Sequence, residues 1–166
     1  MVIRPERPED TSAIRRVLCA AFDTPAEADL VESLREQAQP FVSLVAEDAA
    51  TIVGHILFSP ATFLTHPEIR TMGLAPMAVV PSRQRRGVGS ALVREGLDRC
   101  RELEAAVVIV LGHAHYYPAF GFTPASRFGV TSEYDVPDDV FMLLELKEGA
   151  LLGKSGTMRY HPAFSR

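Results

Sequence analysis

Residues 74–92 read LAPMAVVPSRQRRGVGSAL, and this stretch decides the fold of the 166-residue chain. Its first part is apolar and β-branched, which predicts a strand over residues 70–80. Pro76 interrupts that strand, and because proline cannot donate to a ladder we expect a bulge or an unpaired edge there. After the strand, Val88, Leu92 and further apolar residues recur at helical spacing to about residue 103. The sequence therefore predicts a strand, a glycine-rich turn and a helix in direct succession.

The turn between this strand and helix carries the chemistry. Gly87 and Gly89 let a ligand approach the backbone closely, and the first amide N–H groups of the helix are unpaired at the positive end of its dipole. Arg83, Arg85 and Arg86 crowd into four consecutive positions beside it, although the net charge of the chain is −4. Guanidinium groups suit phosphate oxygens. We therefore expect this turn to bind a polyphosphate.

The composition limits which classes of protein this chain can belong to. With 47% hydrophobic and 23% charged residues, the chain is typical of a folded soluble protein, and its length predicts a single domain over residues 1–166. A disordered tail, a fibre and a uniformly basic nucleic-acid binder are excluded. The charged first ten residues do not resemble a signal peptide, and the apolar run 105–111 is too short to cross a bilayer. We expect a cytoplasmic protein.

The cysteines give no sign of a metal site. Cys19 and Cys100 are far apart and lie outside any CxxC or Cys/His cluster, which argues against a disulfide framework or a zinc site. Both fall at apolar positions of predicted helices, so we expect two small core residues and no metal.

The flanking sequence predicts a mixed α/β chain. Periodicity and turn residues predict an edge strand (2–4), two amphipathic helices (8–22 and 24–34) and a hairpin (41–58) before the strand, turn and helix described above (70–103). A buried strand (106–111), a short helix or turn (116–120) and two closing strands (129–134 and 140–146) follow. The strand at 70–80, the helix and the strand at 106–111 form a parallel crossover. The tail from residue 149 has no clear periodicity, and no element is predicted there.

Three phosphate-binding motifs are candidates for holding this polyphosphate. The dinucleotide fingerprint G-x-G-x-x-G fits Gly87 and Gly89 but fails at Leu92. A Walker pattern is hinted at by residues 153–155, GKS, but Glu148 stands where its first glycine must be. The third pattern, R/Q-x-x-G-x-G/A, fits residues 84–89, QRRGVG, at the end of the interrupted strand.

With this third pattern the sequence resembles the GNAT superfamily of N-acetyltransferases. The tract from Val79 to Leu92, V-x-x-x-R-Q-R-R-G-V-G-S-A-L, is similar to that family's acyl-CoA-binding signature. A second match is VVIVLGHAHYYPAFGF at residues 107–122, whose tyrosine pair narrows the resemblance to the small bacterial YhbS-like branch. The resemblance implies a mixed α/β (α+β) fold with a central twisted mixed sheet, splayed at the acyl-CoA site and flanked by helices.

The family resemblance implies acetyl-CoA as co-substrate, without a metal. The backbone beside the strand break would then bond the pantetheine arm as a pseudo-strand, and the turn would hold the pyrophosphate, with Arg85 or Arg83 left for a more peripheral phosphate. The residues expected to contact the cofactor are Ala78, Val79, Val80, Arg85, Arg86, Gly87, Val88, Gly89 and Ser90.

The resemblance also implies a general acid. Tyr117 matches the family position that protonates the leaving thiolate, and Tyr116 is assigned to the pocket wall. The general base stays open, because residues 71–82 contain no acid. The candidates are water relays to Glu27, Asp29 or Glu47, and the histidines His113 and His115.

The reaction expected is acetyl transfer from acetyl-CoA to a primary amine by direct attack in a ternary complex. The acceptor, a small molecule or a protein amine, and the oligomeric state stay open, a homodimer being one option. Neither nucleic acid nor a membrane is expected as a partner. Two alternatives remain: a non-catalytic acyl-CoA-binding regulator, in keeping with the missing strand carboxylate, and a nucleic-acid module using the arginines, against which the acidic total counts.

Overall fold

The computed structural model describes residues 1–165, and it is a mixed α/β fold as predicted. Its strands are β1 (Val2–Pro5), β2 (Val42–Asp48), β3 (Thr51–Phe63), β4 (Thr71–Val79), β5 (Val107–Leu111), β6 (Thr123–Pro124), β7 (Val130–Ser132), β8 (Phe141–Glu145) and β9 (Gly156–Arg159). Its helices are α1 (Thr11–Ala21), α2 (Ala26–Gln37) and α3 (Val88–Glu102), with short 3-10 turns η1 (Pro8–Asp10), η2 (Pro81–Arg83), η3 (Tyr117–Phe120), η4 (Ala125–Phe128) and η5 (Pro162–Ser165).

The strands form one mixed sheet in the order β1-β2-β3-β4-β5-β8-β6. All neighbours in this order are antiparallel except β4 and β5, which are parallel and joined through α3. β9 pairs with the far end of β3 and, in parallel, with β7. The predicted hairpin and the predicted parallel crossover are therefore both present.

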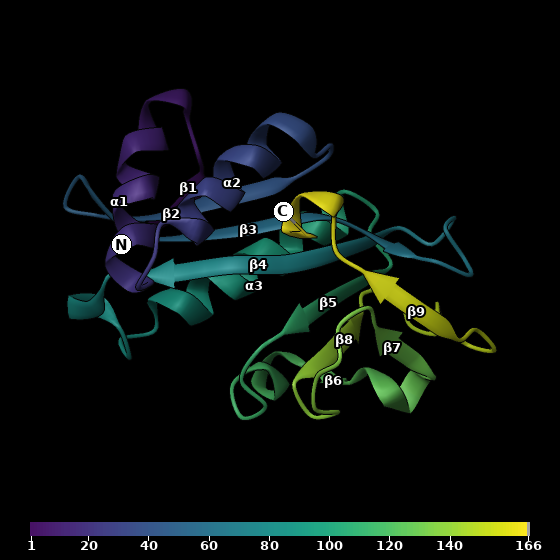
Figure 1. Ribbon diagram of the computed structural model, residues 1–166. Helices are drawn as coiled ribbons and strands as arrows, with labels where there is room; N and C mark the ends of the chain where they lie inside the picture. Colours follow the sequence, from purple (N-terminus) through teal and green to yellow (C-terminus); the bar gives the residue numbers. More distant parts are fainter. Residues whose placement is uncertain (166) are drawn as a thin grey trace.

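The sheet divides at the interrupted strand into a first arm, made of β1 to β4, and a second arm, made of β5, β8 and β6. β4 pairs with β5 only from Thr71 to Leu74, and the two strands then diverge, as Figure 1 shows. On its other edge β4 stays paired with β3, but Ala75 and Pro76 together face the single residue Leu57. Two residues opposite one make a bulge, which confirms the interruption predicted at Pro76.

Helices cover both faces of the first arm (Figure 1). Residues alternate between faces along a strand, so Leu44 and Phe58 pack with α3, whereas Val45 and Leu57 pack with α1 and α2. Gly96 lets α3 lie close to the sheet, because a Cβ there would be 2.1 Å from the Phe58 ring. Because the apolar face of α3 packs on the sheet, the glycine turn at the start of this helix has a fixed place against β4.

Three sequence expectations need correction. β3 continues to Phe63, five residues past its predicted end, because β4 pairs with it as far as Ala61 and β9 pairs with its last two residues. The tail, for which no element was predicted, supplies that strand. Cys19 is exposed rather than part of the core, whereas Cys100 is buried as expected.

None of the helices within residues 1–165 is long and apolar enough to span a membrane.

Candidate active site

The glycine turn has the backbone of an anion site. Gly87 is the N-terminal cap of α3 with φ of 85°, and Arg85 has φ of 62°, so both are left-handed. The first helical hydrogen bond runs from Ala91 N to Gly87 O at 3.0 Å. The amides of Val88, Gly89 and Ser90 precede that bond and are free of the helix, at the positive end of its dipole.

A cavity of about 310 Å³ lies over this turn, between the divergent strands. Its lining joins the turn to the far side of the split sheet, and consists of Met77, Val79, Gln84, Arg85, Gly87, Gly89, Ser90, His113 and Tyr116. The structure therefore brings together five of the predicted cofactor contacts: Val79, Arg85, Gly87, Gly89 and Ser90. Met77 was missed, although its place two residues before Val79 on a strand puts both on one edge.

The other predicted contacts lie around this lining. Arg86 is exposed and the Val88 side chain is buried in the core, so that the backbone of Val88 alone faces the turn. Ala78 faces α1 and α2, opposite His55 of β3. The expectation that Val80 offers an unpaired amide is wrong, because its N–H donates to Val53 O at 2.9 Å.

The open edge of β4 is therefore formed by other residues than predicted: Ala78, like Val80, turns its backbone groups to β3. Since Val80 N–H points to β3, the alternation of a strand turns the backbone groups of Val79 and Met77 to the opposite edge. That edge has no strand beside it, because β4 and β5 have already separated. The side-chain amide of Gln84 donates to Val79 O at 2.9 Å.

The two adjacent tyrosines have different surroundings. Tyr116 reaches over the start of α3, with its hydroxyl 3.2 Å from Ser90 Oγ and 3.1 Å from the position of a Cβ on Gly89. Tyr117 is buried and packs so tightly on Gly112 that a Cβ there would be 2.4 Å from its ring. Burial raises the pKa of Tyr117 to about 12. Tyr117 thus keeps its proton, and lies deeper than Tyr116.

The clustered arginines also separate. Arg83 forms an ion pair with Asp48, at the turn between β2 and β3. Arg85 lines the cavity, on the left-handed turn. The sequence left both Arg85 and Arg83 as candidates for a peripheral phosphate. Arg85 is the better candidate, because Arg83 already has a carboxylate partner.

Of the candidate bases, His113 reaches the cavity. Asp29 pairs with Arg15 at 3.0 Å, and Glu47 pairs with Arg4 at 3.1 Å. Within residues 1–165 no group of three or more His, Cys, Asp or Glu side chains could hold a metal ion.

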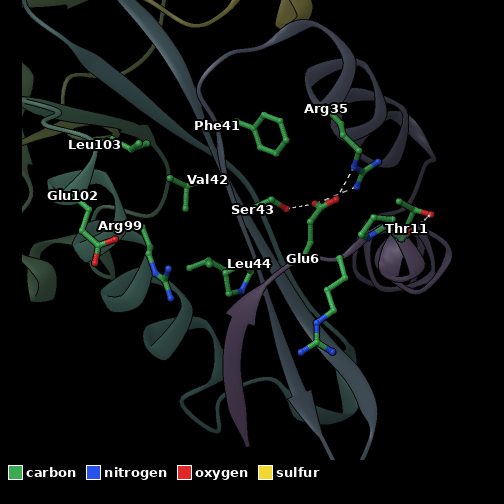
Figure 2. A pocket seen from close by; sticks show the side chains of 13 residues that line it. Glu6, Thr11, Arg35, Phe41, Val42, Ser43, Leu44, Arg99, Glu102 and Leu103 are labelled. Atoms are coloured by element: carbon green, nitrogen blue, oxygen red, sulfur yellow. Dashed lines mark hydrogen bonds and ion pairs between the residues drawn. The ribbon is translucent and has the colours of Figure 1, made fainter.

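A larger cavity, of about 630 Å³, lies at the other end of α3 (Figure 2). It is lined by the end of β1, the start of β2 and the last turn of α3, with Arg99, Glu102 and Leu103 on one side and Glu6 on the other. Arg35 donates to Glu6 at 2.7 Å, and Ser43 bonds both Glu6 and the buried His55. Because this cavity lies at the opposite end of α3 from the turn, we place the candidate active site at the smaller one.

Burial opposes the ionisation of Glu6, but the nearby His55, 3.8 Å away, and hydrogen bonds from Arg35 and Ser43 together lower its pKa to about 2. Glu6 therefore ties β1, β2, β3 and α2 together as a carboxylate. Burial also lowers the pKa of His55.

Comparison with known proteins defines the class. A family model described as an acetyltransferase (GNAT) domain matches residues 2–125. The N-acetyltransferase YjhQ of Escherichia coli (strain K12), itself uncharacterized, is 45% identical over an alignment of 134 residues that covers 78% of this chain and 74% of YjhQ. The chain therefore belongs to the GNAT family and is an acetyltransferase by class, as the sequence predicted.

The same comparisons place the chain in a branch of that family. The uncharacterized N-acetyltransferase YhbS of Escherichia coli (strain K12) is 34% identical over 167 residues, covering 100% of this chain and 99% of YhbS. A crystal structure of Escherichia coli YhbS in complex with CoA superposes with a TM-score of 0.92 at 33% identity, covering 99% of this chain and 92% of that chain. A GNAT acetyltransferase from Brucella melitensis in complex with acetyl-CoA gives a TM-score of 0.81 at 34% identity, covering 98% and 97%. The YhbS-like branch is thus confirmed, and with it the fold.

Proposed function

We propose that this protein transfers the acetyl group of acetyl-CoA to a primary amine, by direct attack within a ternary complex. The observation that carries the proposal is the unpaired edge of β4 at Met77 and Val79, which leads directly to the left-handed turn at Gly87. A ligand with a peptide-like arm and a polyphosphate end fits an open strand edge followed by a helix N-terminus. Coenzyme A has both parts.

The strand edge would hold the pantetheine arm. Val79 offers its backbone groups, and the Gln84 amide that bonds Val79 O is a side-chain donor that a pantetheine amide can replace. The amides of Val88, Gly89 and Ser90 would hold the pyrophosphate, and Arg85 would neutralise part of its charge. The bound co-substrate supplies an acyl thioester, whose carbonyl the amine attacks.

Tyr117 would act as the general acid. Tyr116 lies over the turn that would hold the pyrophosphate, whereas the Tyr117 ring packs on Gly112, just after β5. We therefore place the thioester, at the other end of the arm, beside Tyr117. Burial raises the pKa of Tyr117 to about 12, which keeps the hydroxyl protonated at neutral pH. A protonated phenol within reach of the sulfur can neutralise the departing thiolate.

The amine must lose a proton to a general base. His113 is the candidate base to substitute first, since it lines the cavity. No covalent acyl-enzyme is required: Cys19 is exposed on α1, and Cys100 is buried in α3 with a pKa raised to about 12 by its burial. A thiol of such high pKa is a poor nucleophile at neutral pH.

Two measurements test the proposal. Isothermal calorimetry should show binding of CoA and acetyl-CoA to the protein, and a panel of small amines, amino acids and peptides should release free thiol from acetyl-CoA. Absence of CoA binding would overturn the proposal. Binding without thiol release for any amine would instead support the non-catalytic regulator, which the lack of an acid in residues 71–82 favours.

A further inference from the structure

Tyr160 lies where β4 and β5 separate. Val107 N donates to Arg70 O at 3.4 Å, and the two-residue repeat of a parallel ladder would set Leu111 N–H opposite Leu74 O two rungs later. The Tyr160 hydroxyl takes the place of that rung. Leu111 N–H donates to Tyr160 Oη at 3.1 Å, and the hydroxyl in turn donates to Leu74 O at 3.4 Å. One side-chain oxygen thus bonds both strands where they would otherwise bond each other.

Tyr160 is held at its ring and at its backbone. Gly73 leaves room for it, because a Cβ on Gly73 would be 2.6 Å from two of its carbons. The Tyr160 amide donates to Glu133 at 2.7 Å, and the Phe164 ring packs on the tyrosine with centroids 4.7 Å apart. The side chain is 5% exposed. Burial raises its pKa, so the hydroxyl keeps the proton that it donates to Leu74.

The position of this hydroxyl matters for the cleft. Leu74 is the last residue of β4 that pairs with β5, and it is followed at once by the bulge and by the open edge at Met77. If Leu111 bonded Leu74 directly, the two strands would lie closer at the closed end of the gap. The inserted hydroxyl therefore spaces them apart at that end.

We propose that Tyr160 is a positioning residue for the acyl transfer: its hydroxyl sets the point at which β4 and β5 open, and so the place of the acyl end of the cofactor. This inference rests on the proposed function, since it needs the pantetheine arm to lie along β4. The phosphate end would be held by residues of the glycine turn, whereas the hydrogen bonds of Tyr160 are with Leu74, Leu111 and Glu133. Loss of the hydroxyl should therefore affect one end of the cofactor and spare the other.

The test is calorimetry of Tyr160→Phe with two probes, acetyl-CoA and adenosine 3′,5′-bisphosphate, which carries only the nucleotide end. Removing one buried hydroxyl leaves two backbone groups unpaired, and we expect the affinity for acetyl-CoA to fall about fivefold or more. The affinity for the bisphosphate should stay within about twofold of the wild type, because the turn is intact. Tyr134→Phe, on a tyrosine that is 37% exposed, is the matched control and should change neither.

Two outcomes would overturn the role of Tyr160. Equal losses for both probes would show a general structural defect, and unchanged affinity for acetyl-CoA would show that the hydroxyl does not position the cofactor. A wild-type protein that fails to bind acetyl-CoA would instead overturn the proposed function.

A second substitution approaches the same ring from its other side. Gly73→Ala places a methyl group 2.6 Å from the Tyr160 ring carbons and should displace the ring, with the same selective loss of acetyl-CoA binding. In a Tyr160→Ala background the added methyl should cost less than about twofold, since the ring that it displaces is gone. Additive losses in the double variant would contradict the proposed contact.

Discussion

The hydroxyls of Tyr116 and Ser90 lie 3.2 Å apart, so a tyrosine just before η3 closes over the first turn of α3. Both groups adjoin the free amides of that turn. In the proposed complex they would turn toward the pyrophosphate and donate to it together. The pair thus predicts a contribution to cofactor affinity from a residue far along the chain from the phosphate motif.

Tyr116→Phe should weaken CoA binding about tenfold, the usual effect of losing one hydrogen bond to a charged group. Calorimetry measures this directly. Tyr134→Phe again serves as control. An unchanged dissociation constant would mean that the Tyr116 hydroxyl does not face the phosphates.

Gly87 is predicted to matter for its backbone rather than for its size. Its φ is 85°, and a Cβ there would have nothing within 4 Å. Gly87→Ala should therefore cost about 1–2 kcal/mol through left-handed strain and weaken CoA binding as the turn relaxes. Gly87→Asn should recover much of both losses, since asparagine tolerates that region. Equal behaviour of the two variants, in thermal unfolding and calorimetry, would refute this account.

Arg85 and Arg83 form a matched pair, because each substitution removes one positive charge. Arg85→Ala should weaken CoA binding by roughly fivefold to tenfold and reduce its salt dependence, since Arg85 lines the cavity. Arg83→Ala should change affinity by less than about twofold, because Asp48 already neutralises Arg83. The reverse ranking, measured at two salt concentrations, would place the phosphates on the other side of the turn.

Tyr117→Phe should lower turnover by about a hundredfold or more and leave CoA affinity nearly unchanged. The acid form of Tyr117 is the active one, and its pKa is about 12, so Tyr117 causes no loss of wild-type turnover as pH rises through the neutral range. A fall would come only as pH approaches about 12. Turnover that survives Tyr117→Phe at every pH would remove Tyr117 from the mechanism.

The Glu6 network predicts sensitivity to acid. The pKa of Glu6 is about 2 in the folded chain against an ordinary value of 4.5. The stability from this carboxylate is thus fully present above about pH 4.5 and is lost as pH falls toward 2. At about 1.4 kcal/mol per pKa unit the loss is roughly 3 kcal/mol.

Glu6→Gln should abolish that acid-dependent part and lower the unfolding midpoint at neutral pH, whereas Glu9→Gln, on an exposed residue, should do neither. The check is chemical unfolding across pH. His55 acts in the same sense. Because burial lowers its pKa, the unfolded chain protonates this histidine more readily than the folded chain as pH falls below the ordinary value of 6.5, and the stability of the fold decreases. An acid profile unaltered by Glu6→Gln would contradict this reading.

The sequence was sufficient for the parts of the site that rest on local backbone chemistry. Pro76 predicted the bulge, because a proline has no amide to donate, and Gly87 predicted the turn, because few residues other than glycine adopt its left-handed φ. The sequence did not show which of residues 77–80 turn their backbone groups to the open edge. These groups alternate between the two edges of a strand, and the alternation is set by the bond of Val80 to β3. Tyr160 could not be found at all, since its role depends on a ladder between strands that pair far from it in sequence.

The pairing of Thr62 with Arg159 has a consequence for how the protein folds. Contacts between such distant residues form slowly, because a long loop must close before they can be made. The hairpins of the first arm are local and should form early. The cleft between β4 and β5 should be complete only after β9 has docked, because Tyr160, which bonds both strands, directly follows β9. Acetyl-CoA would bind only this last state, so we expect its concentration to shift the folding equilibrium toward the native chain.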